Sequence, residues 1–477
     1  MSNFIQFVLS ELKSVLTLLI LAGLFTAFAL VLIYLGYNKK HKGEKKFPWG
    51  KIILYLLLAG YLIILFFTTI LRRHGGFYSK YNLHLFRAWV EAWNNYSVMN
   101  WANVLLNVAL FVPLGGLLPL LWKKCKQWYI TIPVGFGTSL IIELVQLVLR
   151  RGTCDIDDLF ANTLGTAIGF LCIMAILSLR NEKGHKMKPC LLYGGIALLP
   201  VLAICSIFIA YQIQEYGNLP QAASYTQNTQ NVTWILNCKL PEMDAEIPIY
   251  QTQTRSKADC DAFAEDFKKI INTEYTTISY YDEAAYYMDN STDGGAHFLY
   301  VDYLDQGYDY SAHFDDNPTW AAADRATVVG LLAKYPLQIP ETSEFTVETD
   351  GWHAFRSYKH IDKTMLFDGT LLVRIAEDNS IREIKNHLLS YTYYDKVRVI
   401  SPEEAFTLLK AGRFNDNGYF EQIKPTEITV SKCDLEYRVD TKGFYQPVYT
   451  FHLIYNNDSL VYGNDIFAYN IMIPAIK

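Results

Sequence analysis

The chain of 477 residues is too long for one ordinary domain, and its charge is divided between two halves. Residues 1–212 carry 20 Lys and Arg against 8 Asp and Glu, whereas residues 213–477 carry 22 against 39. The basic residues of the first half lie in short loops beside long apolar runs, as membrane topology requires. The pattern gives no support to nucleic-acid binding and predicts a membrane region followed by an acidic, water-exposed domain.

The eight cysteines occur singly, without the CxxC or CxxH spacing of a zinc site. We therefore expect no metal. Cys238, Cys260 and Cys433 lie in the second half, where one disulfide is an option, most simply Cys238–Cys260.

Six apolar runs each approach the roughly 20 residues that cross a bilayer. Their expected ranges are 14–37, 51–71, 102–122, 128–149, 159–179 and 190–212. The loops after the first, third and fifth runs are the richest in Lys, so the positive-inside rule places them in the cytoplasm. Both termini are then expected outside the cell membrane.

The expected domain organisation follows from these runs and from a polar, turn-rich stretch after the last one. It comprises an N-terminal helix and basic loop (1–50), a central membrane domain (51–180), a last membrane helix (181–212), a linker (213–229) and an extracytoplasmic α+β domain, with two lobes as an option (230–477).

Five polar side chains lie inside apolar runs, and a membrane segment that keeps such residues usually uses them. They are Asn103, Asn107, Glu143, Gln146 and Asn162. At about 1.5 Å per residue, three of them lie roughly 6–10 Å below the expected outer ends of their helices. Residues three or four apart share one helical face. We therefore expect three polar helix faces to meet in one hydrogen-bonded site that opens outward.

The alternative is that these side chains only join helices, since polar contacts between membrane helices contribute roughly 1 kcal/mol or less. For Asn103, Asn107 and Gln146 both interpretations stay open. An acid such as Glu143 is costly in lipid, which favours a functional role. Gly165 and Gly169, four residues apart, would let the fifth run pack closely on a neighbour.

An acidic run formed by Asp155, Asp157 and Asp158 precedes the fifth apolar run. Asp155 or Asp157 is well explained as a helix cap with favourable dipole charge. That explanation fits Asp158 and Asn162 less well, so we assign both to the candidate site. The run holds too few ligands for an EF-hand calcium loop.

Motifs in a fixed order between Leu71 and Leu179 resemble the VanZ-like family of bacterial membrane proteins. They are Arg72-Arg73, Asn82-Leu83-His84-Leu85-Phe86-Arg87, Asn107-x-x-x-Phe111-x-Pro113-x-Gly115, Glu143-x-x-Gln146 and Arg151-x-x-x-Asp155-x-Asp157-Asp158-x-x-x-Asn162-Thr163-x-Gly165. One departure is Leu85, where family members often have Pro. The resemblance implies a cell-envelope protein, linked in some members to lowered teicoplanin susceptibility, and it supplies no agreed chemical reaction.

The polar residues and the resemblance together define one candidate ligand-binding site. Its expected acceptors are Glu143 and Asp158, its orienting amides are Asn107, Gln146 and Asn162, its anchors for an anionic headgroup are Arg72, Arg73 and Arg151, and its remaining members are Asn82, Arg87 and Asp155. Arginine suits the anchoring role because its fork of N–H groups matches phosphate oxygens.

Beyond residue 229 the sequence alternates between helix and strand patterns. Helices are expected over 258–271, 325–335 and 402–411, and strands over 275–288, 297–303, 344–348, 351–358, 365–367, 371–376, 388–400, 426–438 and 446–455. Ser401 and Glu404 have the spacing of a capping box, and Asp368-Gly369 that of a hairpin turn. The later elements loosely resemble the extracytoplasmic PepSY- and YycI-like modules, which implies a binding or regulatory domain.

The fold class we predict is a helical membrane domain of about six spans followed by an extracytoplasmic α+β domain. We favour a non-enzymatic, multi-pass protein of the bacterial cell membrane whose polar pocket takes a lipid-linked or glycolipid ligand, with a lipid-linked cell-wall precursor or a glycopeptide as candidates. The alternatives are an enzyme acting on a lipid-linked precursor, with Glu143 as general acid or base, and a structural anchor for the external domain. Membrane lipids are expected partners, nucleic acids and cofactors are not, and the protein partner is left open.

Overall fold

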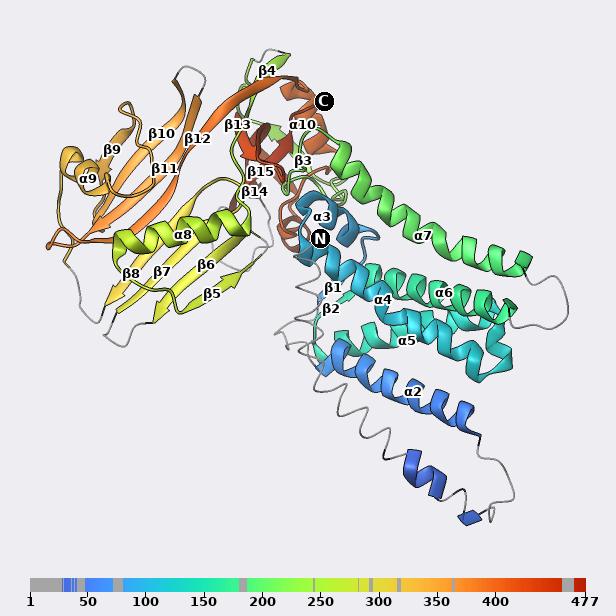
Figure 1. Ribbon diagram of the computed structural model, residues 1–477. Coiled ribbons are helices and arrows are strands. Elements are labelled where there is room, and N and C mark those ends of the chain that lie inside the picture. The colour runs from blue at the N-terminus through green and yellow to red at the C-terminus, as the bar shows by residue number, and fades with distance from the viewer. Residues whose placement is uncertain are drawn as a thin grey trace. The chain divides into compact units, whose positions relative to one another are not determined.

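The computed structural model describes residues 28, 30–35, 37, 39–40, 48–71, 80–179, 187–242, 245–281, 283–290, 295–314, 319–362, 365–456 and 467–477. The chain divides into two compact units, Met1–Gln214 and Glu215–Lys477. The first is helical and the second is built on strands (Figure 1).

In the first unit the described residues 28, 30–35, 37 and 39–40 are helical, and six α-helices follow within the described ranges. They are α2 (Trp49–Phe66), continued by the π-helical segment η1 (Phe67–Leu71), α3 (Arg87–Asn95), α4 (Val98–Leu121), α5 (Trp128–Leu149), α6 (Ile156–Leu179) and α7 (Met187–Ile213). All except α3 are long and apolar enough to cross a membrane. Five of the predicted spans are thereby confirmed as apolar helices, whereas the first, 14–37, falls largely outside the described residues.

Glycines let α4 and α6 pack with their backbones in contact. A Cβ atom added to Gly165 would lie 2.0 Å from the Val108 carbonyl oxygen, and one added to Gly169 would lie 2.0 Å from that of Val112. Small residues at such positions allow the close approach that membrane helices use in place of hydrophobic burial. The predicted close packing of the fifth apolar run is confirmed, and α6 is fixed against α4 along several turns.

A two-stranded parallel sheet joins two loops at one end of the first unit. Strand β1 (Lys80–Asn82) follows the α2 region, and β2 (Thr153–Asp155) lies between α5 and α6. The register pairs Asn82 with Asp155. These strands place the loop before α3 directly against the start of α6, and we call this region the β1–β2 end.

Within the described residues, the second unit carries one sheet of thirteen strands with four helices. In chain order the elements are β3 (Thr233–Leu236), β4 (Glu246–Gln251), α8 (Lys257–Ile271), β5 (Thr277–Tyr280), β6 (Ala284–Asn290), β7 (Gly295–Asp302), β8 (Tyr308–Phe314), α9 (Arg325–Leu332), β9 (Glu344–Val347), β10 (Trp352–Asp362), β11 (Met365–Ile375), β12 (Ile381–Arg398), α10 (Pro402–Lys410), α11 (Tyr419–Ile423), β13 (Glu427–Val439), β14 (Phe444–Asn456) and β15 (Phe467–Pro474). The α+β class predicted for this half is confirmed.

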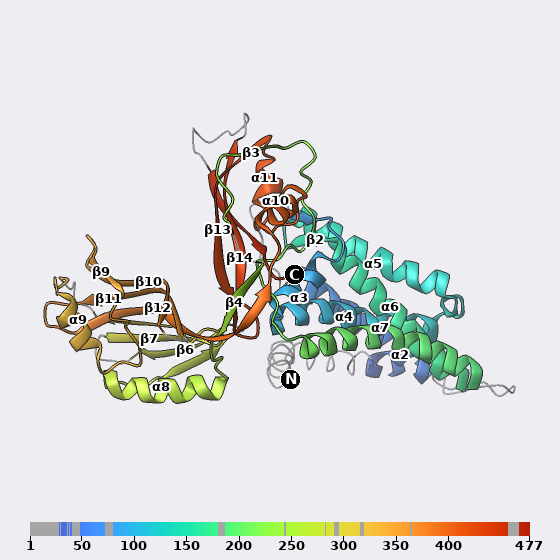
Figure 2. The ribbon, with the colours of Figure 1, turned by 90° about the horizontal axis from the view of Figure 1, so that it is seen from above.

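Strand β12 joins two parts of this sheet (Figure 2). The strand order is β3-β13-β14-β4-β12-β8-β7-β6-β5, with β11, β10 and β9 attached to β12 and β15 attached to β14. One residue block of β12, Glu383–Asn386, pairs with β8, and a later block, Thr392–Arg398, pairs with β4. Each part of the sheet has its own core, centred on Phe267 and Tyr308 in one and on Tyr449 and Phe451 in the other.

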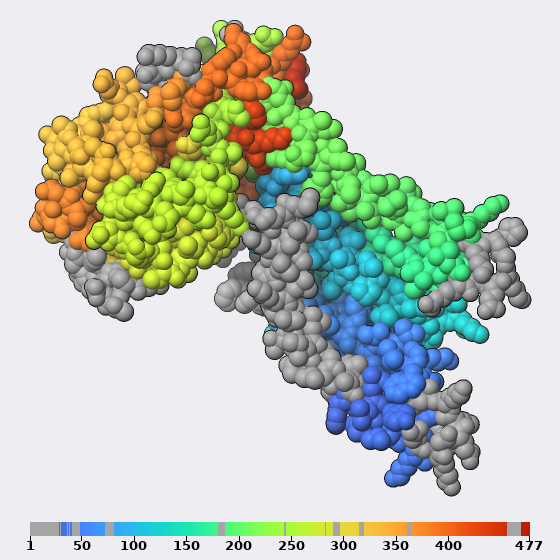
Figure 3. Space-filling view, viewed as in Figure 1, coloured from blue at the N-terminus to red at the C-terminus, as the bar shows by residue number. Residues whose placement is uncertain are grey.

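Helix α8 packs on β6 and β7 and lies at the surface of the unit (Figure 3). It begins with a capping box in which Ser256 and Asp259 bond each other's main chains. The capping box predicted for Ser401 and Glu404 is confirmed at the start of α10.

Three details of the second unit differ from the sequence expectations. The single strand expected over 275–288 is a hairpin, β5 and β6. Asp368 and Gly369 lie inside β11 and pair with Leu389 and Leu388, so they form no turn. Cys238, Cys260 and Cys433 are free thiols, so the optional disulfide is absent among them.

Candidate functional site

The described members of the candidate site gather at the β1–β2 end. They are Asn82 on β1, Arg87 on α3, Asn107 on α4, Glu143 and Gln146 on α5, Arg151 and Asp155 between α5 and α6, and Asp158 and Asn162 on α6. Arg72 and Arg73 lie outside the described residues. Hydrogen bonds join most of the described members to one another in pairs or to nearby main chain.

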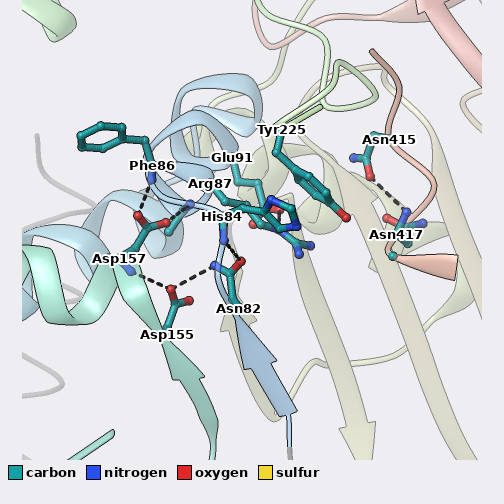
Figure 4. Close-up of polar contacts among 12 residues, drawn as sticks. Asn82, His84, Phe86, Arg87, Glu91, Asp155, Asp157, Tyr225, Asn415 and Asn417 are labelled. Atoms are coloured by element: carbon teal, nitrogen blue, oxygen red, sulfur yellow. Dashed lines mark hydrogen bonds and ion pairs between the residues drawn. The ribbon is translucent and has the colours of Figure 1, made fainter. Parts of the chain in front are cut away.

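Asp155 is the centre of a network that holds the two loops together (Figure 4). Its Oδ1 accepts a hydrogen bond from Asn82 Nδ2 at 3.0 Å and another from the Asp157 main-chain N–H at 2.8 Å. The Oδ1 of Asn82 in turn accepts the main-chain N–H of His84 at 3.1 Å. Asn82 and Asp155 thus fix the turn that leads into α3.

Asp157 holds the first turn of α3. Its two carboxylate oxygens accept the main-chain N–H groups of Phe86, at 2.5 Å, and Ala88, at 2.7 Å. Phe86 has a left-handed backbone with a φ of 68°, which directs its N–H toward the start of α6. The sequence interpretation of Asp157 as a cap of its own helix missed this role, because the helix it caps lies about 70 residues earlier in the chain.

Glu143 lies on α5 and is almost fully buried, with 3% of its surface exposed. Its Oε2 accepts the main-chain N–H of Asp155 at 2.8 Å. A buried N–H that loses its acceptor costs about 1–3 kcal/mol, so this contact ties the end of β2 to α5.

Gln146 and Arg151 donate hydrogen bonds to main-chain carbonyls of η1. The Gln146 Nε2 donates to the Thr69 carbonyl at 2.9 Å, and the Arg151 Nη1 donates to the Ile70 carbonyl at 3.4 Å. Gln146 is 1% exposed, which is consistent with a positioning role. Arg151 is half-buried.

Asn107 and Asp158 form a direct bridge between α4 and α6. The Asn107 Nδ2 donates to the Asp158 Oδ1 at 2.5 Å. Both residues are half-buried, in contrast to Glu143 and Gln146. The polar atoms of Asn107 and Asp158 are therefore closer to the surface of the helical unit than those of Glu143 and Gln146.

Asn162 links α6 to α5 at greater depth. Its Nδ2 donates to the Ser139 Oγ at 2.9 Å, and the residue is 4% exposed. Its Oδ1 has no hydrogen-bond partner among the described residues. Such a buried acceptor is uncommon in proteins, and here it faces the interface between two helices.

Negative charge predominates among the described side chains of this region. Burial raises the pKa of the Cys154 thiol, and the nearby carboxylates of Glu143, Asp155 and Asp158 raise it further. Arg87 is paired with Glu91 at 2.7 Å on α3. Within the described ranges, no three His, Cys, Asp or Glu side chains are arranged to hold a metal ion.

These features define the first unit as a multi-span helical membrane domain with a polar cluster at one end. Residues 52–178 match the family model described as VanZ/LLP1, and we refer to this region as the VanZ-like domain for that similarity. Protein VanZ of Enterococcus faecium is 28% identical over 160 residues, a match that covers 32% of this chain and 93% of that protein.

Two solved structures are also similar to the chain. One is an uncharacterized protein from Eubacterium rectale, with 12% identity and a TM-score of 0.23, covering 54% of this chain and 90% of that one. The other is the YpeB C-terminal domain of Bacillus megaterium, with 14% identity and a TM-score of 0.16, covering 47% and 95%. With TM-scores this low, neither likeness carries an argument about this fold.

Proposed function

We propose that the VanZ-like domain binds an amphiphilic cell-envelope lipid, with its headgroup at the β1–β2 end and its chain along the helices. The ligand class is a lipid-linked or glycolipid molecule of the outer leaflet. Through this binding the protein would lower the susceptibility of a bacterium to a glycopeptide such as teicoplanin.

The observation that carries this proposal is an apolar groove whose lining on α4 begins at Val112, beyond the Asn107–Asp158 hydrogen bond. The groove has a volume of about 720 Å³ and runs between α2, α4 and α6. Its lining includes Leu57, Ile64, Val112, Leu117, Ile173 and Ile176. Val112 follows Asn107 by five residues, or roughly 8 Å along α4. A molecule with a polar head and an apolar chain fits this order of surfaces.

The headgroup anchors in this proposal are arginines. Arg151 is half-buried at the β1–β2 end, and Arg72 and Arg73 follow η1 directly in the sequence. A guanidinium binds phosphate or pyrophosphate oxygens in a two-pronged geometry.

The orientation in the membrane is part of the proposal. Lys123, Lys124 and Lys126 lie between α4 and α5, at the opposite end of these helices from β1 and β2. By the positive-inside rule this lysine-rich end faces the cytoplasm. The β1–β2 end, and the C-terminal unit that follows α7, would then lie outside the cell membrane.

The buried acids favour a positioning role over catalysis. Glu143 and Asp157 are 3% and 2% exposed, and each accepts main-chain N–H groups. A general acid or base must reach a reacting atom within hydrogen-bond distance. The same contacts support the rival function of a structural anchor, in which the cluster stabilises the fold and binds nothing.

Teicoplanin susceptibility separates the lipid-binding role from the structural anchor. A sensitive host would express equal, membrane-verified amounts of wild type, Asn107→Leu and Asn103→Leu. Asn103 lies one turn earlier on α4 and is exposed, so it is a matched control. We expect protection by wild type and Asn103→Leu and its loss with Asn107→Leu. Equal protection by Asn107→Leu would support the anchor instead.

A further inference from the structure

The C-terminal unit contains a second polar site that is independent of the VanZ-like domain. It is a cavity of about 360 Å³ between the loop before α8, the β7–β8 turn, the segment after α9 and strand β12. Its lining includes Arg255, Asp305, Tyr335, Gln338, Asn386 and Ser390. A cavity of this size is within the range that holds small molecules.

Asn386 lines this cavity and carries an acceptor without a hydrogen-bond partner among the described residues. The residue is 5% exposed, and the acceptor is its Oδ1. Leaving such a group unpaired is unfavourable, so a ligand that donates an N–H or O–H here recovers that loss.

Arg255 supplies a positive charge on the same cavity. Its Nη1 donates to the main-chain carbonyls of Gln306 at 3.0 Å and Gly307 at 3.5 Å, and its guanidinium lies 4.5 Å from the centre of the Phe263 ring. These contacts orient the group without neutralising it. Burial lowers the pKa of the guanidinium, which shows that its charge is partly desolvated.

Asp305 supplies a negative charge beside it. Its Oδ1 accepts the Gly307 N–H at 2.8 Å, which leaves Oδ2 without a hydrogen bond among the described residues. The turn is closely packed, since a Cβ at Gly307 would lie 2.8 Å from that Oδ1 and 3.2 Å from His387 Nδ1. Burial and the neighbouring Asp302 raise the pKa of Asp305 to about 6.

We propose that this cavity binds a free amino acid or a short peptide by its charged ends. The ligand carboxylate pairs with Arg255, and the ammonium group donates to Asp305 Oδ2 and Asn386 Oδ1. A zwitterion offsets both buried charges and satisfies the unused acceptor. A neutral sugar would satisfy Asn386 but would give neither partly desolvated charge an opposite charge beyond the one that each finds in the other.

The test is a binding experiment on the full-length protein in detergent micelles. The probes are glycine, alanine and alanylalanine, with N-acetylalaninamide as the control because it lacks both charged ends. Isothermal titration and the unfolding temperature report binding. We expect at least one unblocked probe to bind with a Kd below about 1 mM and to raise the unfolding temperature, and the blocked probe to do neither.

Substitutions of residues that line the cavity test whether the probes bind there. Arg255→Gln and Asp305→Asn are expected to weaken the best probe by about tenfold or more. Their matched controls are Arg398→Gln and Asp378→Asn, whose side chains are exposed and lie outside the cavity. Should Arg255→Gln fail to fold, Ser390→Phe fills the cavity from β12 and supplies the same comparison.

The proposal is overturned if no unblocked probe binds, or if N-acetylalaninamide binds as well as alanylalanine. It is also overturned if Asp305→Asn and the cavity-filling variant, both folded, bind the probes like wild type. These outcomes do not depend on lipid binding by the VanZ-like domain.

Discussion

The Glu143 carboxylate accepts the main-chain N–H of Asp155 at 2.8 Å, joining the middle of one membrane helix to the strand that precedes the next. The Asp155 side chain in turn accepts a hydrogen bond from Asn82 on β1. A buried acid in a membrane helix therefore fixes the loop geometry at the β1–β2 end. The Glu143 carboxylate, which is costly to bury in a membrane, stabilises this loop through its hydrogen bond.

The first prediction concerns this contact. Glu143→Leu should leave the Asp155 N–H without an acceptor and reduce the free energy of unfolding by about 1–3 kcal/mol. Glu143→Gln keeps an oxygen at the same place and should cost less. The comparison is made by denaturant unfolding in a mild detergent. Equal losses for the two variants would show that the charge of Glu143 matters more than its hydrogen bond.

The second prediction concerns the packing of α4 and α6. Gly165→Ala places a methyl group 2.0 Å from the Val108 carbonyl oxygen, so the helices must separate. We expect destabilisation of about 1–3 kcal/mol, the usual range for overpacking. Gly137→Ala is the control, because no atom lies within 4 Å of its added Cβ. The unfolding temperature should fall for Gly165→Ala and stay level or rise for Gly137→Ala.

The third prediction concerns Asp157. Asp157→Ala removes the acceptor for two main-chain N–H groups at the start of α3, a loss of about 1–2 kcal/mol. Amide hydrogen exchange in α3 should become roughly tenfold faster or more. Glu91→Gln breaks the partly exposed pair with Arg87 and should leave exchange in α3 nearly unchanged. Unchanged exchange in Asp157→Ala would contradict the capping role.

The fourth prediction is a pH dependence of the C-terminal unit. The pKa of Asp305 is raised to about 6, whereas an unfolded aspartate titrates near about 3.9. Between these values the folded state holds a proton that the unfolded state has released, so stability falls as pH rises. Wild type should therefore lose free energy of unfolding as the pH rises from about 4 to about 6. Asp305→Asn should lose roughly 1–2 kcal/mol less over the same range.

His387 contributes to the pH profile with the same sign. Its hydrogen bond to Asp309 raises its pKa, so its contribution is complete below the unfolded pKa of about 6.5 and is lost as pH rises through the folded value. Unfolding temperatures of wild type and Asp305→Asn, measured across this range, separate the two groups. A wild-type profile that rises with pH between about 4 and 6 would contradict the assignment to Asp305.

Local sequence patterns were sufficient for the membrane helices and for α10. Five apolar runs of sufficient length are helices, and the Ser401–Glu404 spacing marks the start of α10 as expected. In each case the residues that make the pattern and the helix that they predict belong to the same segment of the chain. Helix α3 was missed because its nine residues were taken for part of a loop between two spans.

Contacts between distant segments explain the rest. Asn82 and Asp155 are 73 residues apart in the sequence, and the local sequence around each of them does not predict their hydrogen bond. Gly369 looked like a turn residue, but it is required within β11 because a Cβ there would lie 1.9 Å from the His387 carbonyl oxygen. The partners of Glu143 and Asp157 are main-chain N–H groups, which carry no signal in the sequence.

The most direct test of the lipid-binding proposal is the lipid that copurifies with the protein. Native mass spectrometry would compare wild type with Gly60→Leu, which fills the groove, and with Gly137→Leu, which lies outside it. Added Cβ atoms at both glycines meet no atom within 4 Å, so both variants should fold. We predict that wild type and Gly137→Leu retain a bound lipid and that Gly60→Leu loses it. Equal lipid retention by all three folded proteins, or its absence from wild type, would contradict the account.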